Sequence, residues 1–179
     1  MKKKRILALF LAAVSCLSLA VSASAAGTTT RKATDFKDYD RTAWYAEAVS
    51  AAVDNGLLYG KSATIIDPNG DMTRAEMAAI INRSFGCYVK ADISKYKDVS
   101  KDKWYFEDVA MAVQMGTYNG RSNTAMAPDA PISRQEAMTV VARALELDYD
   151  AYAKTDLSAF SDRSEISNWA LPYVRAMVG

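Results

Sequence analysis

Apolar residues recur at three- and four-residue steps after residue 43, which is the spacing of one buried stripe on an amphipathic helix. The stripe consists of Trp44, Ala48, Val49, Ala52 and Val53. Asn55 and Gly56 follow it, and both residue types readily adopt the left-handed conformation at a helix C-terminus. The pattern therefore predicts a short helix that ends at this Asn-Gly pair.

A second helix is predicted to open at Thr73-Arg74-Ala75-Glu76, after a long loop. The loop contains Gly60, Pro68 and Gly70. The predicted apolar face of the second helix consists of Met77, Ile80, Ile81 and Phe85. Strand patterns are weak along the chain, and only residues 63–66 resemble a brief extended segment. The expected fold class is all-α, built from helical hairpins.

The pair of predicted helices occurs twice, because a shift of 60 residues aligns residues 36–86 with residues 96–146 without a gap. Lys37-Asp38 falls on Lys97-Asp98, and Trp44-Tyr45 falls on Trp104-Tyr105. The second helix of the second copy opens at Ser133-Arg134-Gln135-Glu136, with an expected apolar face of Ala137, Val140, Val141 and Leu145. Each copy is therefore expected to form two short helices around a long loop.

A third copy begins at Phe160-Ser161-Asp162 and continues to Trp169 and Val174, but it covers only the first half of the pattern. A half repeat does not bury its own apolar face, so either the natural chain continues beyond Gly179 or this end frays, and we favour continuation. The expected boundaries are a signal peptide at 1–25, a linker at 26–35, repeat 1 at 36–89, repeat 2 at 90–148, and a linker with half of a third repeat at 149–179.

The first 25 residues have the features of a secretory signal peptide. Four basic residues at positions 2–5 precede an apolar run at 6–14, and Ala23-Ser24-Ala25 provides small residues for cleavage. The apolar run is too short to span a membrane. Lipoprotein processing at Cys16 stays open as an alternative. Removal of residues 1–25 leaves 18 basic against 21 acidic residues, and this mildly acidic balance argues against a nucleic-acid-binding protein.

The chain has no histidine and two cysteines, which excludes several kinds of chemistry. Catalytic triads that use histidine and histidine-ligated zinc are not possible. Cys87 is left alone once Cys16 is removed, so no internal disulfide is expected. Asp67-Pro68-Asn69-Gly70-Asp71 lacks the spacing and terminal glutamate of a calcium-binding loop. We expect no cofactor, no metal site and no catalysis from this segment.

The segments Thr73-x-x-Glu76 and Ser133-x-x-Glu136 have the form of helix capping boxes. Capping does not account for Arg74 and Arg134, because a cation in the first turn of a helix faces the positive end of the helix dipole. Two explanations stay open. Each arginine pairs with an aspartate of the repeat or lies along the loop, or each forms an anion site with the free amides of the helix start.

The pattern F-x-D, W-Y, A-V, G, G, P and T-R-A-E resembles the S-layer homology (SLH) domain family. Residues 36–86, 96–146 and 160–179 carry this resemblance, with Thr73-Arg74-Ala75-Glu76 unaltered. The resemblance implies repeats packed around a pseudo-threefold axis that hold a secreted protein non-covalently on the bacterial cell wall or S-layer. It also implies a ligand, a secondary cell-wall polysaccharide with pyruvate ketals or a peptidoglycan-linked polymer, bound between neighbouring repeats. The pyruvyl carboxylate suits Arg74 and Arg134.

Other repeated positions are candidate ligand contacts, each with a structural alternative. Asp38, Asp98 and Asp162 either contact sugar hydroxyls or support the helix entry and the motif arginine. Trp44, Trp104 and Trp169 either stack on a sugar ring or, as we favour, belong to the core. Gly60 and Gly120 either permit a positive φ or allow backbone to approach sugar. Lys61 and Arg121 add charge to a groove or only solvate the loop.

Two further functions stay open beside the wall anchor. In the first, the repeats are a structural module that associates with other repeats, through the incomplete third copy above all. In the second, they anchor an enzyme whose catalytic domain lies beyond Gly179. The resemblance favours a non-catalytic module that binds a carboxylated wall polysaccharide.

Overall fold

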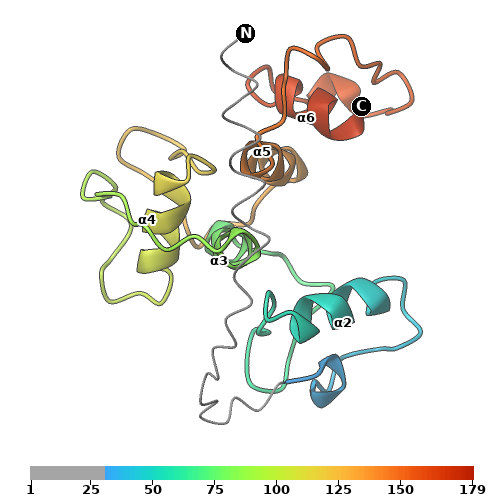
Figure 1. Ribbon diagram of the computed structural model, residues 1–179, viewed down its shortest axis with the longest axis vertical. Helices are drawn as coiled ribbons and strands as arrows, with labels where there is room; N and C mark the ends of the chain where they lie inside the picture. The colour runs from blue at the N-terminus through green and yellow to red at the C-terminus, as the bar shows by residue number, and fades with distance from the viewer. Residues whose placement is uncertain (1–30) are drawn as a thin grey trace, which may run out of the picture. The chain divides into compact units, whose positions relative to one another are not determined.

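The computed structural model describes residues 31–179, and this part of the chain is helical without strands (Figure 1). The expected all-α class is confirmed, and residues 63–66 belong to a loop. The signal peptide and the possible lipidation at Cys16 lie outside the described residues. The helices are α2 (Ala46–Asp54), α3 (Arg74–Phe85), α4 (Phe106–Gln114), α5 (Arg134–Ala144) and α6 (Leu171–Val178), with short 3-10 helices η1 (Ala33–Asp35) and η2 (Arg163–Glu165).

Both predicted capping boxes are present at the starts of α3 and α5. The Thr73 hydroxyl accepts from the Glu76 amide at 3.2 Å, and the Thr73 amide donates to the Glu76 carboxylate at 2.8 Å. Ser133 and Glu136 repeat these contacts at 3.3 and 2.9 Å. Such caps satisfy backbone groups that have no partner inside the helix, which explains why the second helix of each repeat begins at the same motif.

The helices pair across the repeat boundary, which corrects the expected hairpin within each repeat. Helix α4 packs on α3 and α6 packs on α5, whereas no Cα atoms of α2 and α3, or of α4 and α5, lie within 8 Å. A backbone hydrogen bond also joins the two repeats, because the Ala75 amide of repeat 1 donates to the Pro128 carbonyl of repeat 2 at 2.9 Å. The pattern of apolar residues predicted that each helix has a buried stripe, but it could not identify the helix that covers it.

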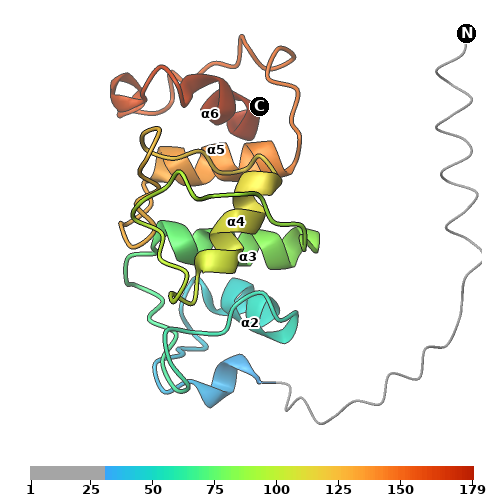
Figure 2. The ribbon, with the colours of Figure 1, turned by 90° about the vertical axis from the view of Figure 1, so that its left-hand side faces the viewer.

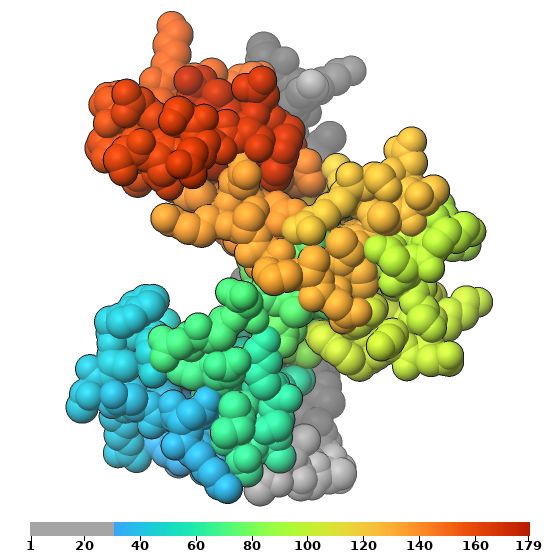
Figure 3. All heavy atoms as spheres, turned by 180° about the vertical axis from the view of Figure 1, so that it is seen from behind, coloured from blue at the N-terminus to red at the C-terminus, as the bar shows by residue number. Residues whose placement is uncertain are grey.

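Helices α3 and α5 contact each other at the centre, and α2, α4 and α6 lie on three sides of this pair (Figures 1 and 2). This arrangement agrees with repeats set around a pseudo-threefold axis. Seen from behind, repeat 1 and the last 30 residues form separate lobes with the surface hollowed between them (Figure 3). The third copy itself stays a prediction, supported by the packing of α6 on α5 in the same way as α4 packs on α3.

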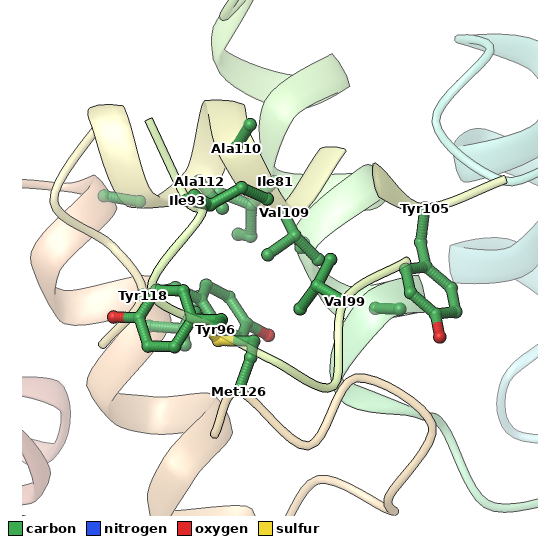
Figure 4. Packing of buried hydrophobic residues seen from close by; sticks show 14 residues of the cluster. Ile81, Ile93, Tyr96, Val99, Tyr105, Val109, Ala110, Ala112, Tyr118 and Met126 are labelled. Atoms are coloured by element: carbon green, nitrogen blue, oxygen red, sulfur yellow. The ribbon is translucent and has the colours of Figure 1, made fainter. Parts of the chain in front are cut away.

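The main core lies where α3, α4 and the loops of repeat 2 meet (Figure 4). Ala78 and Ala112 are fully buried there, and small side chains let helices approach closely. Tyr96, Tyr118 and Met126 fill the space beside them. The predicted apolar faces were partly wrong, because Phe85 and Leu145 are exposed while the alanines of α3 are buried. Central helices bury a ridge of small residues, which a search for large apolar side chains does not find.

Candidate ligand-binding grooves

Two surface grooves occupy equivalent positions in the repeats. Groove A has a volume of about 520 Å³ and is formed by the long loop of repeat 1, α3 and Trp104. Groove B has a volume of about 360 Å³ and is formed by the long loop of repeat 2, α5 and Trp169. The 60-residue shift relates their shared lining pairs: Gly60 and Gly120, Lys61 and Arg121, Glu76 and Glu136, Ile80 and Val140, Arg83 and Arg143. The repeat thus builds the same groove twice.

The tryptophans lie at the surface, so our expectation that they belong to the core is wrong. Trp44 is 92% exposed, Trp104 60% and Trp169 52%. The buried partner in the second W-Y pair is Tyr105, which packs edge-on against Trp104 with ring centroids 5.4 Å apart. Trp104 and Trp169 each line the groove of the preceding repeat. Each groove therefore has a flat aromatic face along one wall.

Lys61 and Arg121 pair with the glutamate of the capping box in their own repeat. The Lys61 ammonium lies 2.8 Å from the Glu76 carboxylate, and Arg121 donates to both carboxylate oxygens of Glu136 at 3.1 Å. Burial raises the pKa of Glu76, but hydrogen bonds from Lys61 and from the Thr73 backbone outweigh it and lower the pKa overall. The pKa of Glu136 is lowered in the same way by Arg121 and Ser133. Both glutamates are therefore anchored as carboxylates.

Arg83 and Arg143 also line the grooves, although the sequence analysis did not select them. Arg83 donates to the Leu57 carbonyl at 3.0 Å and lies 4.1 Å from the centre of the Tyr59 ring. Arg143 donates to the Tyr173 hydroxyl at 3.1 Å. The 60-residue shift aligns the two arginines, and this recurrence is the signal that could have selected them. A cation in the last turn of a helix also interacts favourably with the helix dipole, so recurrence alone does not separate the two roles.

Arg74 contacts the next repeat and is only 5% exposed. Its guanidinium donates to the Met126 carbonyl at 3.0 Å, to the Asn119 carbonyl at 3.1 Å and to the Glu136 carboxylate at 2.9 Å. Of the two explanations for this residue, the structure favours pairing with a carboxylate, but the partner is a glutamate of repeat 2 and not an aspartate. Arg74 lines groove B from within the protein and fixes repeat 1 to repeat 2.

Arg134 lies in a different environment from its repeat equivalent. It is exposed and lines a third pocket of about 320 Å³ together with apolar side chains such as Met138 and Phe160. Its guanidinium makes no ion pair within residues 31–179. The two environments differ because the groups that contact the Arg74 guanidinium belong to the long loop and helix α5 of repeat 2. The burial of the motif arginine therefore depends on the segment that packs against it.

Asp38 and Asp98 fasten the long loop of their own repeat. Asp38 accepts from the Ile66 and Asp67 amides at 3.0 and 2.6 Å, and Asp98 accepts from the Met126 and Ala127 amides at 2.9 and 2.7 Å. The backbone amide of Ile66 is the main cause that lowers the pKa of Asp38. Asp67 and Ala127 have φ of 57° and 53°, a conformation that costs free energy for residues other than glycine. The aspartates stabilise these strained turns.

Gly60 and Gly120 are required by close contact with an aromatic ring of the same repeat. A Cβ on Gly60 would lie 2.5 Å from the Phe36 ring, and a Cβ on Gly120 would lie 2.5 Å from the Tyr96 ring. The expected positive φ is found at Gly60, where it is 82°, but not at Gly120. The fold therefore accounts for both glycines, which also lie along the floor of the grooves.

No helix in the described residues has the length and apolar character needed to cross a membrane. Residues 31–179 also contain no group of three acidic or cysteine side chains placed to hold a metal ion.

Comparison with known proteins identifies the repeats. The family model for the S-layer homology domain matches residues 35–78 and 95–138. A surface-layer 125 kDa protein of Lysinibacillus sphaericus is 33% identical over 82% of this chain and 12% of its own length. An endoglucanase of Bacillus sp. (strain KSM-635) is 26% identical over 93% of this chain and 18% of its own.

The S-layer protein sap of Bacillus anthracis is 24% identical over 75% of this chain and 16% of its own length. The chain thus spans less than a fifth of each of these relatives. S-layer homology domains bind cell-wall polymers, and the protein is a secreted one associated with the cell wall. Residues 35–78 and 95–138 are two S-layer homology domains, and the chain belongs to that family.

Proposed function

We propose that this module anchors its protein to the cell wall by binding a secondary cell-wall polysaccharide that carries pyruvate ketals. The observation that carries the proposal is the repetition of one groove with a tryptophan face and two cationic side chains. A sugar ring stacks on Trp104 or Trp169. The ketal carboxylate pairs with a guanidinium at the other side of the groove.

The proposed contact for the carboxylate is Arg121 with Arg143, and not the motif arginine Arg74. Arg74 already donates to three acceptors of the chain and is almost fully buried. The side chain of Arg121 is 44% exposed, and it reaches the same groove as Arg143. Asp38, Asp98, Gly60 and Gly120 contribute by holding the loops that carry these side chains.

The grooves also support a non-catalytic role. Glycoside hydrolysis needs a carboxylic acid whose pKa is raised, so that it can donate a proton near neutral pH. Glu76 and Glu136, the carboxylates that recur in both grooves, have lowered pKa values and are paired with cations. We therefore propose binding without hydrolysis.

The tryptophan contacts can be tested with purified walls that contain the polymer. We expect Trp104→Ala with Trp169→Ala to weaken co-sedimentation of the protein with walls about tenfold or more, because aromatic side chains carry much of the binding free energy at such sites. Trp44→Ala is the matched control, since Trp44 is equally aromatic and more exposed but lines neither groove. Equal losses for both variants would contradict the proposal.

Arg134 supports a second proposal, that the module associates with another repeat. The pocket beside Arg134 is lined by apolar side chains and by the carboxylates of Asp162 and Glu165, and the equivalent arginine Arg74 is covered by a loop and a glutamate of the following repeat. A segment of the same type, from this protein or another, would cover Arg134 similarly. Sedimentation velocity would establish this proposal if the chain associates and Arg134→Glu abolishes the association while wall binding is unchanged.

The match to an endoglucanase also raises a role as the anchor of an enzyme.

A further inference from the structure

Grooves A and B have the same construction but opposite charge. Two cations line groove A, Lys61 and Arg83, against three carboxylates, those of Asp67, Asp71 and Glu76. Three arginines line groove B, Arg74, Arg121 and Arg143, against the single carboxylate of Glu136. Groove A therefore carries a net negative charge and groove B a net positive charge, although the repeats align without a gap.

Two positions produce most of this difference. Asp67 in repeat 1 corresponds to Ala127 in repeat 2, and Asp71 corresponds to Pro131. The backbone does not change with the residue, because φ is 57° at Asp67 and 53° at Ala127. The carboxylates of Asp38 and Asp98 hold both turns through the same pair of amides. The two repeats thus have the same loop conformation but different charges on the loop.

The ion pairs inside the grooves leave the contrast in place. Glu76 neutralises Lys61 in groove A, and Asp67 and Asp71 line the same groove as Arg83. In groove B the one carboxylate, Glu136, serves both Arg74 and Arg121. Arg143, like Arg83, makes no ion pair among residues 31–179, and it is held in place by the Tyr173 hydroxyl. Groove B therefore contains a positioned guanidinium that an arriving carboxylate can pair with.

From these observations we infer that groove B alone takes the carboxylate-bearing sugar, and that each chain binds one such sugar. Groove A repels the anion, because Asp67 and Asp71 line it and give it a net negative charge. The inference rests on the proposed function, since it assigns the acidic ligand of that function to one of two similar grooves.

Calorimetric titration of the full chain with a hexose that carries a pyruvate ketal tests the inference, with the methyl ester of the same sugar as the uncharged probe. We expect one binding site per chain for the acid, and at least tenfold weaker binding of the ester. Arg121→Gln with Arg143→Gln should weaken binding of the acid tenfold or more. Lys61→Gln with Arg83→Gln makes the same change in groove A and locates the site, because a loss of acid binding in this variant in place of the groove B variant would overturn the inference.

A charge exchange between the repeats makes the test independent of losses in folding. Ala127→Asp gives the long loop of repeat 2 the residue that repeat 1 carries at the same φ, and we expect it to weaken binding of the acid about tenfold. Ala127→Asn is the matched control of nearly equal shape without charge, and it should bind like the unchanged protein. Asp67→Asn with Asp71→Asn removes two charges from groove A and should raise the number of sites from one to two.

The results separate the inference from the proposed function. Two equal sites in the unchanged protein, or loss of binding with Lys61→Gln and Arg83→Gln only, would overturn the inference and leave the proposed function standing. If neither the acid nor its methyl ester bound to the chain, both the proposed function and the inference would be overturned. Equal affinity for acid and ester would show that charge does not select the groove, which also overturns the inference.

Discussion

Arg74 and Arg134 occupy the same position in two copies of one motif, yet one is buried and the other exposed. The repeat pattern predicted that both arginines have one role, which it left as either pairing or anion binding. The structure separates them, because a loop and a glutamate of the following repeat cover Arg74. A residue's position in a repeat therefore fixes its backbone and its cap, while its electrostatic role depends on the next repeat along the chain.

Replacing the two arginines should have very different effects on stability. We expect Arg74→Met to lower the free energy of unfolding by about 3 kcal/mol, because it leaves buried acceptors and part of the Glu136 charge unpaired. Arg134→Met should change it by about 0.5 kcal/mol or less, as for an exposed side chain. Urea denaturation followed by circular dichroism measures both. Similar losses for the two variants would show that the burial of Arg74 contributes little.

The first helix of repeat 2 packs on the second helix of repeat 1, because α4 contacts α3, and α6 contacts α5 in the same way. Among the elements of residues 31–179, only η1 contacts α2. Hydrophobic periodicity located α2 and the start of α3 because both are local properties of the sequence. It placed the stripe of α2 only in part, because Val53 is buried whereas Trp44 and Ala48 are exposed. The choice of partner depends on the path of a long loop, which local patterns do not determine.

The equivalent alanines Ala52 and Ala112 test this pairing. Ala112 is fully buried in the core where α4 packs on α3, so Ala112→Leu should overpack the interface and destabilise the protein by about 1–3 kcal/mol. Ala52→Leu makes the same change on α2, which contacts no other α-helix of residues 31–179, and should cost less than about 1 kcal/mol. Thermal or urea unfolding of the two variants gives the comparison. A larger loss for Ala52→Leu would contradict the pairing across repeats.

At the scale of the whole molecule, carboxylates fasten the repeats and line their grooves. The 60-residue repeat predicted the all-α class and the recurrence of each loop. It also made Lys61, Arg121, Trp104 and Gly60 candidate ligand contacts, each beside a structural alternative, and for Trp104 the favoured alternative, a place in the core, is wrong. It did not reveal the opposite charges of the two grooves, because these arise where the repeats differ and only the fold places those positions in a groove. Positions that agree between the copies predict the fold, and positions that differ between them predict which ligand each groove binds.

Acid should destabilise the molecule through these carboxylates. Folding lowers the pKa values of Asp38, Asp98, Glu76 and Glu136. Their contribution to stability is therefore complete above the pKa of the unfolded chain and is lost as pH falls through the lower pKa of the folded state. We expect the free energy of unfolding to fall between about pH 5 and pH 3. Urea titrations across this range measure it, and Glu76→Gln with Glu136→Gln should flatten the curve. Constant stability to pH 3 would contradict these pKa shifts.

The measurement that tests the wall-anchor account most directly compares one protein on two preparations of the same wall. The purified chain is sedimented with bacterial walls before and after mild acid has removed the pyruvate ketals from the polysaccharide. We predict that removal weakens binding at least about tenfold, because the groove loses a charge-assisted pair with its ligand. Equal binding to both preparations would contradict recognition of the carboxylate.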